Sequence, residues 1–572
     1  MTRIPLIVSL LFVSLFATAA DRPNVILILT DDQGFGDVGF HGNSELNTPY
    51  LDQLANESTE LTNFYVQPLC TPTRAALLTG RYPERTGAVE VNFGRSIIRE
   101  EEVTIAEELK AAGYRTGIFG KWHLGDNYPV RPSDMGFEEC LHHTAGGVGQ
   151  AGDPPGNTYF DPILQHNNVP KKYEGYCNDI FFHEAMDFAE ANKDDPFFIF
   201  LATNLPHLPL QVDEKYVKPY RKYGVNEINA KTYGMIANID ENVGYVMKRL
   251  KELDLEDDTI VIFLSDNGPR TSRQKNDLYP DRYNAGLRGT KSSMYEGGIR
   301  VPFLIRWPGK FEAGAKLPQI AAHIDLLPTL LDVCGASVTD EDRVVDGKSL
   351  LPLLSNPKNK WPDRMLFFQH NANHEPLMYS HFAARSQRYK IVQPLPNPRD
   401  TVLDIGEYDI NAQLKSLELY DIENDPSEIT NIANSHPDLV ESMMESYENW
   451  YRDVTAELDY WNPQRIYLGA PEENPAQLST FDLQKMTRLP FWSARVTRAG
   501  NYRFTLKFNR ATEDCTAYLR FGSVQVSQPI SAGDTSCVFD SVTLRSGDGR
   551  LEAWLKKGLD SKTVNFLVAE YR

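Results

Sequence analysis

Five short, mostly apolar runs of residues stand out in the first 306 residues, and the first four are followed at once by polar residues or glycine. They span 24–29, 115–119, 196–202, 259–264 and 301–306. Continuous rather than alternating apolar strands indicate a sheet that is covered on both faces. Apolar residues recur at helical spacing in the segments 104–112, 233–253 and 325–333. The alternation of strand and helix predicts an α/β domain with a large, mostly parallel sheet between helices.

The pattern changes twice after this domain. Short strands at 365–370, 382–385, 389–392 and 417–421 and a helix at 438–455 predict a small α+β subdomain. In the last hundred residues the apolar positions alternate, as at Tyr502, Phe504, Leu506 and Phe508, which predicts an antiparallel β-sandwich. The expected organisation is therefore a leader at 1–20, an α/β domain at 21–359, the subdomain at 360–470 and the sandwich at 471–572.

Charge supports the last boundary and excludes one class of function. The 572 residues carry 58 Lys and Arg against 78 Asp and Glu, a net charge of −20. Residues 471–572 alone carry 14 basic and 11 acidic side chains, a net charge of +3. A strongly acidic chain gains nothing from displacing the counterions of a polyanion, so we expect no nucleic-acid partner.

The first twenty residues have the features of an export signal. Arg3 precedes an apolar run at 4–16, and Ala17-Thr18-Ala19 offers a small-residue cleavage site. Because a membrane span needs about 20 apolar residues, we expect an exported protein without one. Export permits disulfides. Cys515–Cys537 and Cys140–Cys177 are candidate pairs, and buried free thiols are an equal alternative for both.

Oxygen donors follow two of the predicted strands. Asp31-Asp32 ends the first, and Asp266-Asn267 ends the fourth. Each pair alone is typical of a solvated turn. Carboxyl ends of parallel strands meet at one sheet edge, however, and carboxylates gathered there repel one another unless a cation lies among them. A ligand set of oxygen without His or Cys favours Ca²⁺ or Mg²⁺.

A short helix carries a cysteine and an arginine. Pro72 suits the first turn of a helix, and the Ala-Ala-Leu-Leu that follows Arg74 continues it. Cys70 then lies at the N-terminal, positive end of the helix dipole, with Arg74 on the same face. On position alone, a buried cysteine with a surface arginine is the better explanation of this segment.

Four further basic side chains lie in segments that follow strands. They are Lys121, His123, His207 and Lys291. Taken singly, each is typical of a surface charge or of a satisfied core histidine. Taken together with Arg74 beside a cation, they suit a tetrahedral oxyanion, with donors for its oxygens and imidazoles for proton transfer.

These segments resemble the type I sulfatase family, which belongs to the alkaline phosphatase superfamily. The signature is Cys70-Thr71-Pro72-Thr73-Arg74 followed by Leu78-Thr79-Gly80-Arg81. Further similar segments occur in the family's order: Asp31-Asp32-Gln33-Gly34, Gly120-Lys121-Trp122-His123-Leu124-Gly125, Pro206-His207, Ser265-Asp266-Asn267-Gly268, Glu296-Gly297-Gly298 and Leu419-Tyr420-Asp421. The resemblance covers about residues 22 to 460, so the predicted sandwich lies outside it.

The resemblance implies an alkaline-phosphatase-like fold and a formylglycine-dependent sulfuric ester hydrolase. A maturation enzyme would convert Cys70 to formylglycine (3-oxoalanine), whose gem-diol attacks sulfur. Calcium, rather than magnesium, would be bound by Asp31, Asp32, Cys70, Asp266 and Asn267. Arg74, Lys121 and Lys291 would offset charge. His207, alone or together with Lys291, would protonate the leaving alcohol, and His123 would accept a proton as sulfate leaves. Lys121, His207 and Lys291 would also contact the substrate.

The substrate is less closely defined by the sequence. Export and an appended sandwich favour sulfated carbohydrate, and the polar loops at 146–172 and 269–287 are expected to border the pocket. The basic residues in and just after the second loop are either an anion-binding set or a solvated basic surface: Arg270, Arg273, Lys275, Arg282 and Arg288. Trp122, His370 and His374 are weaker candidates, and one polar family position matches none of His142, His143 and Thr144 clearly. The alternatives are a phosphate or phosphonate ester hydrolase of the same superfamily and a non-catalytic glycan-binding protein.

Overall fold

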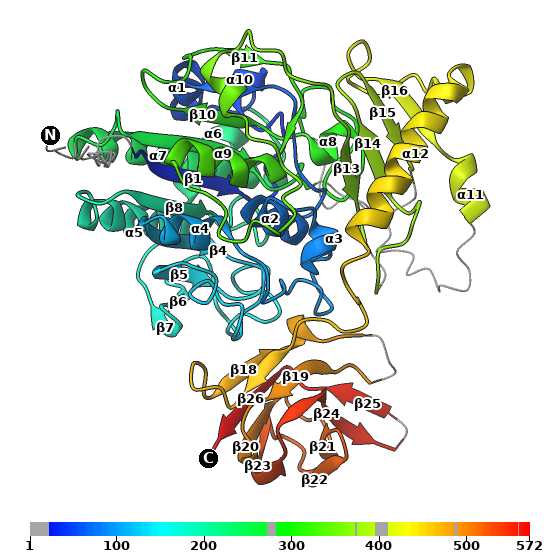
Figure 1. Ribbon diagram of the computed structural model, residues 1–572. Helices are drawn as coiled ribbons and strands as arrows, with labels where there is room; N and C mark the ends of the chain where they lie inside the picture. The colour runs from blue at the N-terminus through cyan, green and yellow to red at the C-terminus, as the bar shows by residue number, and fades with distance from the viewer. Residues whose placement is uncertain (1–21, 271–281, 372–373, 395–409, 486–488, 559) are drawn as a thin grey trace, which may run out of the picture.

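The computed structural model describes residues 22–270, 282–371, 374–394, 410–485, 489–558 and 560–572. The expected leader at 1–20 lies outside this range. Figure 1 shows a large α/β unit, a small sheet with a long helix beside it, and a separate β-sandwich that ends the chain. In the described part, no helix is both long and apolar enough to cross a membrane.

A ten-stranded sheet forms the centre of the α/β unit. Its strands follow the order β11 (Lys316–Leu317), β2 (Thr59–Leu61), β10 (Phe303–Arg306), β9 (Thr259–Ser265), β1 (Asn24–Thr30), β8 (Phe197–Ala202), β4 (Arg115–Lys121), β5 (Glu139–His143), β6 (Ile163–His166) and β7 (Val169–Lys172). Strands β9, β1, β8, β4 and β5 are parallel, whereas β10 runs antiparallel to β9. All five predicted strands are therefore present, and the predicted fold class is confirmed.

Helices cover both faces of this sheet, as the unbroken apolar strands require. In β1, Val25, Leu27 and Leu29 pack into the core beneath one set of helices, and Ile26 and Ile28 pack into the other. The first set is α2 (Cys70–Thr79), α4 (Ile105–Ala111) and α9 (Leu326–Cys334). The second set is α1 (Pro49–Glu57), α5 (Cys177–Ala191) and α7 (Glu227–Glu252). Each core excludes water from one face of the sheet. The two cores together hold the strands in place, and with them the sheet edge at which the strands end.

The loop predicted at 146–172 contains a hairpin instead. Strands β6 and β7 pair with each other, and β6 also pairs with β5, so the hairpin extends the sheet. Its residues are mostly exposed, and β7 is exposed throughout. Because Leu164 is the only buried residue of these two strands, the sequence carries no alternating pattern that would have predicted them.

The α+β subdomain follows the prediction closely. An antiparallel sheet is formed by β13 (Leu366–Gln369), β14 (Phe382–Arg385), β15 (Tyr389–Val392) and β16 (Glu418–Asp421). Helix α12 (Pro437–Val454) packs on it through Tyr447 and Trp450. The same core contains Tyr65 and Ala76 of the α/β unit, so the subdomain and the unit share one packed interface.

The sandwich consists of two sheets. One contains β17 (Ile466–Leu468), β19 (Trp492–Val496), β24 (Gly547–Lys557), β21 (Cys515–Phe521), β22 (Val524–Ile530) and β25 (Asp560–Thr563). The other contains β18 (Ala476–Ser479), β26 (Phe566–Tyr571), β20 (Gly500–Lys507) and β23 (Ser536–Leu544). Strand β17 already pairs with β19, so the sandwich includes residues before 471. Tyr502, Phe504 and Phe508 are buried between the sheets.

The six cysteines are all described, and none of them forms a disulfide. Cys140 and Cys177, one of the candidate pairs, are both buried. Cys515 and Cys537 lie in different sheets of the sandwich as free thiols. Of the two alternatives for each pair, the structure has the free thiol.

Candidate active site

The sheet topology brings distant segments to one edge. Strands β9, β1, β8 and β4 are parallel neighbours, so Asp266-Asn267, Asp31-Asp32, His207 and Lys121 all lie at their carboxyl ends. Strand β10 is antiparallel, so the chain that precedes it, including Lys291, reaches the same edge. The ten residues predicted for the site come together here, each no more than 8% exposed: Asp31, Asp32, Cys70, Arg74, Lys121, His123, His207, Asp266, Asn267 and Lys291.

Oxygen atoms without partners converge in this cluster. The side chains of Asp31, Cys70 and Asp266 bring one ligand atom each within 4.8 Å of one another, as do those of Asp31, Asp32 and His207. Asp31 Oδ1, Asp32 Oδ2 and Asn267 Oδ1 are buried and have no hydrogen-bond partner. Buried acceptors of this kind are costly to leave unpaired. The arrangement therefore fits a hard metal ion with oxygen ligands.

Three ion pairs join the carboxylates to basic side chains. Lys121 Nζ lies 2.7 Å from Asp31 Oδ2, Arg74 Nη2 lies 2.8 Å from Asp266 Oδ2, and Lys291 Nζ contacts Asp32 Oδ1. Burial alone would raise the pKa of Asp31 and of Asp32, but the nearby lysines and His207 hold both below the usual range.

Asp266 behaves differently from the other two carboxyls. Burial and the charge of Asp31 raise its pKa to about 6, although Arg74 opposes the change. Burial beside Asp31 thus disfavours the charged form of Asp266 even with Arg74 as its partner, and a divalent cation would stabilise that charged form.

Cys70 begins helix α2, all ten residues of which are buried. Gly80, with φ +66°, ends the helix in the left-handed conformation that glycine adopts without strain. The thiol is 2% exposed, and burial raises its pKa, although Lys121 and Lys291 act in the opposite direction. An unmodified Cys70 is therefore a neutral thiol at pH 7, which is a poor nucleophile.

The two histidines of the cluster are both buried and neutral. Burial lowers the pKa of His123 well below its usual value, with Lys121 adding to the effect, and lowers that of His207 to about 4 against the pull of Asp31 and Asp32. Lys291, despite its burial, has its pKa raised by Asp32 and remains protonated. The site thus holds two neutral imidazoles and a charged ammonium, which can accept and donate protons.

Two residues that the sequence did not single out contact the histidines. Gln150 Nε2 lies 3.1 Å from His207 Nδ1 and donates to the Leu208 carbonyl at 2.8 Å. The Phe481 ring, from the sandwich, lies against His123 with ring centroids 5.3 Å apart. The glycine-rich composition around Gln150 was the only local signal for the first contact, and no local signal marks the second.

The weaker candidates have other partners. Arg282 pairs with Asp37 at 2.7 Å, and Arg288 donates to the Tyr420 hydroxyl at 2.9 Å. Trp122 is buried and donates to a backbone carbonyl. His370 is buried and lies 3.3 Å from Glu90. Arg273 and Lys275 lie outside the described residues, and the ring nitrogen Nε2 of His143 is buried without a partner.

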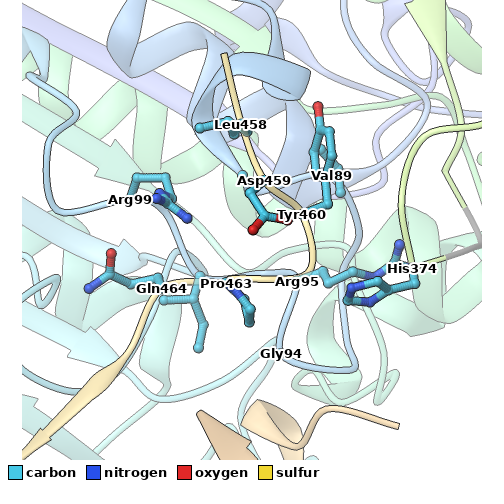
Figure 2. A pocket seen from close by; sticks show the side chains of 12 residues that line it. Val89, Gly94, Arg95, Arg99, His374, Leu458, Asp459, Tyr460, Pro463 and Gln464 are labelled. Carbon is cyan, nitrogen blue, oxygen red and sulfur yellow. The ribbon is translucent and has the colours of Figure 1, made fainter. Parts of the chain in front are cut away.

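Apart from the active-site cluster, a cavity lies where the chain leaves the subdomain for the sandwich (Figure 2). Arg95 and His374 line one side of it, and the segment 458–464 crosses it. Arg95 Nη1 and His374 Nε2 are buried without partners, whereas the carboxylate of Asp459 also lines the cavity. The loop that carries Arg95 therefore contacts both the subdomain and the connection to the sandwich.

Comparison with known proteins decides the family. The family model "Sulfatase" matches residues 23–336, and the model "N-sulphoglucosamine sulphohydrolase, C-terminal" matches residues 289–451. The chain belongs to the sulfatase family. Both matches end before β17, so the sandwich lies outside them.

Relatives of this sulfatase include well-known enzymes. This chain is 34% identical to human arylsulfatase A over 461 residues, which cover 74% of this chain and 87% of the human protein. It is 29% identical to the N-acetylgalactosamine-6-O-sulfatase of Bacteroides thetaiotaomicron, covering 75% and 93% of the two chains. The protein is therefore a sulfuric ester hydrolase.

Solved structures agree with the fold. Ps i-CgsB in complex with k-i-k-neocarrahexaose has a TM-score of 0.66 and 29% identity, over 76% of this chain and 94% of that one. The phosphonate monoester hydrolase of Agrobacterium radiobacter has a TM-score of 0.50 and 20% identity, over 76% and 96%. The second likeness shows a common fold alone.

Proposed function

We propose that this sulfatase is an exported enzyme that removes sulfate from sulfated carbohydrates, with Cys70 converted to formylglycine and Ca²⁺ at the site. The observation that carries the proposal is the buried cluster in which Asp31, Cys70 and Asp266 meet beside three basic side chains. Two comparisons support the substrate class. One relative is named as an N-acetylgalactosamine-6-O-sulfatase, and one structural neighbour is described in complex with a carrageenan-type oligosaccharide.

Calcium would be held by Asp31, Asp32, Asp266, Asn267 and the side chain at position 70. The unpartnered oxygens of three of these residues support this assignment. All-oxygen ligation without a rigid octahedral cage favours Ca²⁺ over Mg²⁺, which keeps more of its water. The ion would supply Lewis acidity to a sulfate oxygen and to a hydroxyl at position 70.

Position 70 suits a nucleophile that is not a thiolate. Burial keeps the cysteine neutral, and the helix start directs backbone N–H groups at an anion. Formylglycine, made by a maturation enzyme and hydrated to a gem-diol, would supply the oxygen that bonds to sulfur and would be restored when sulfate leaves.

The basic residues divide into charge and proton roles. Arg74, Lys121 and Lys291 offset the negative charge that develops on the sulfate oxygens. His207 gives a proton to the ester oxygen as its bond to sulfur breaks, with Lys291 as a second source. His123 accepts the proton that is released as sulfate departs. Carboxylate partners hold Arg74, Lys121 and Lys291 in place, so these side chains meet the substrate already oriented.

The proposed export rests on the leader-like segment 1–20. The sandwich is either a carbohydrate-binding module or a structural cap. Its aromatic residues Tyr502, Phe504 and Phe508 are buried in the core, so these three offer no platform for a sugar.

The test is sulfate release, with Ca²⁺, from a panel of sulfated glycans and an aryl sulfate. The protein is co-expressed with a maturation enzyme, and phosphate and phosphonate esters are measured in parallel. Cys70→Ala is the inactive comparison, and Cys334→Ala, another buried free cysteine, is the matched control. We expect sulfate release by the wild type and by Cys334→Ala only, with a glycan preferred over the aryl ester.

Other results would separate the alternatives. Faster release of phosphate or phosphonate would move the enzyme to the phosphoester class. Glycan binding retained by Cys70→Ala, with no turnover by wild type whose Cys70 is shown by peptide mass to be converted, would favour a glycan-binding protein.

A further inference from the structure

The sandwich reaches the candidate active site through one turn. Residues Thr480–Asp482 form a short 3₁₀ turn after β18, and this turn lies against the loop of His123. The rings of Phe481 and His123 are inclined at 41°. A Cβ atom built on Gly146 would lie 3.2 Å from His123 Nε2 and 3.6 Å from Phe481. Gly146 and Phe481 are thus both neighbours of the imidazole and of each other.

The turn is held firmly within the sandwich. Ser479 Oγ accepts from the Phe481 N–H at 3.1 Å and donates to Asp482 Oδ2 at 3.0 Å. The Trp492 indole N–H donates to the Ser479 carbonyl at 2.6 Å. Ser479 is also the last residue of β18, which pairs with β26. Phe481 therefore extends from a rigid sheet edge rather than from a free loop.

The turn is also joined to the α/β unit. Gln484 Nε2 donates to the Gly94 carbonyl at 3.0 Å, and the Gly94 N–H donates to the Phe481 carbonyl at 3.4 Å. A Cβ atom on Gly94 would lie 2.2 Å from Gln484 Nε2, and one on Gly152 would lie 3.0 Å from the Phe481 Cβ. Only residues without a side chain leave room for this turn.

His123 has few other restraints on its ring. Nδ1 has no hydrogen-bond partner, and Nε2 makes one long contact of 3.3 Å with the Val91 carbonyl. The side chain is nevertheless only 3% exposed. The orientation of the imidazole is therefore set mainly by the surfaces packed on it, and Phe481 is one of them.

We propose that Phe481 is a positioning residue for His123, so that the sandwich completes the active site instead of being only an appendage. The proposal rests on the proposed function, in which His123 accepts the proton that is released as sulfate leaves. Loss of the Phe481 ring then slows the departure of sulfate and spares the earlier departure of the alcohol.

The test compares Phe481→Ala, Phe481→Tyr and Phe521→Ala in the full-length, matured protein. Phe521 is a partly buried aromatic residue of the same sandwich, packed on its core. Because small displacements of a catalytic group cost up to about 100-fold, we expect Phe481→Ala to lower kcat by about 10- to 100-fold. Since only the later step is slowed, KM should fall in proportion and kcat/KM should stay near the wild-type value. With an aryl sulfate, the alcohol should appear in a burst equal to the enzyme concentration, followed by slow sulfate release. Phe481→Tyr, which keeps the ring, should stay within about threefold of wild type.

A second readout needs no turnover. Diethyl pyrocarbonate acylates accessible imidazoles, and peptide mass reports the rate at His123 in protein whose Cys70 is unconverted. We expect slow modification in wild type and in Phe521→Ala, and several-fold faster modification in Phe481→Ala.

Three results would overturn the proposal: wild-type kcat in Phe481→Ala, an equal loss in Phe521→Ala, or unchanged modification of His123. Failure of the proposed function looks different, because converted wild-type protein would then release no sulfate from any probe, while the modification assay would still report the packing of Phe481 on His123.

Discussion

The α/β unit and the sandwich differ in where they bury charge. The unit buries Asp31, Asp32 and Asp266 with basic partners at the centre of its sheet edge. Among the described residues from 466 onwards, the buried polar side chains are Ser479, Asp482, Gln484 and Glu552. The first three belong to the segment that contacts the α/β unit.

This difference shows how function can be located without a bound ligand. Burying charge costs free energy, and folding alone does not require it. A chain therefore keeps buried charge where another demand is met, which in the α/β unit is the proposed binding of a metal ion and sulfate. By the same criterion, the turn at 480–482 is the part of the sandwich that we propose to matter for catalysis. Apart from Glu552, the interior of the rest is apolar.

The largest expected effect comes from removal of the metal, which separates the two regions. Chelation should lower sulfate release by about 10³-fold, because the ion contributes several kcal/mol of charge stabilisation. The repulsion between Asp31 and Asp266 is then offset only by Lys121 and Arg74, so the α/β unit should melt at a lower temperature while the sandwich is unaffected. Calcium should restore both properties better than magnesium. Full activity after exhaustive chelation, checked by metal analysis, would contradict the assignment.

The next effect concerns the proton donor. His207 has a pKa of about 4, so above that pH the fraction of molecules with a protonated His207 falls tenfold for each pH unit. If it donates to the alcohol, kcat/KM should fall as pH rises from about 5 to 8. His207→Gln should lose about 10²- to 10⁴-fold and remove this slope. His183→Gln, an exposed histidine of α5, is the control. A flat wild-type profile would assign the proton to Lys291.

The smallest effect lies at the contact between the two regions. Burial raises the pKa of Asp482 to about 6, and burial together with the Asp482 charge raises that of Asp126 well above the usual value. These carboxyls take up protons on folding, so they cost no stability below about pH 4 and their cost grows as pH rises through 6. Asp482→Asn should therefore raise the melting temperature by about 1–3 °C at pH 8 and not at pH 4.

The control for this last prediction is Asp560→Asn, an exposed residue of β25. It should change the melting temperature at neither pH. An equal gain in both variants, or a gain for Asp482→Asn that is independent of pH, would mean that the Asp482 carboxylate carries no cost from burial.

Much of the α/β unit could be predicted because its information is local. Buried strands such as β1 and β9 are unbroken apolar runs, and parallel neighbours place the residues that follow them at one edge. The predicted site residues that end or follow β1, β4, β8 and β9 came together for that reason, whereas Cys70 and Arg74 reach the edge from α2 and Lys291 from the chain before β10. The family motifs added the expected roles, which composition and spacing could not provide.

The features that escaped prediction depend on contacts that are distant in sequence or on exposed strands. Strands β6 and β7 bury almost nothing, so they have no apolar alternation. Phe481 meets His123 across more than 300 residues of sequence. The Ser479…Asp482 capping pattern does predict a turn, but a pattern within the turn cannot tell which surface the turn faces.

The most direct test of the central claim relates sulfate release to the chemical state of Cys70. Preparations with different degrees of conversion are obtained by varying the level of the maturation enzyme, and peptide mass gives the converted fraction. With Ca²⁺ present, we predict a rate of sulfate release that is proportional to this fraction and extrapolates to zero. A rate that is independent of conversion would show that another nucleophile acts at this site and would contradict the account.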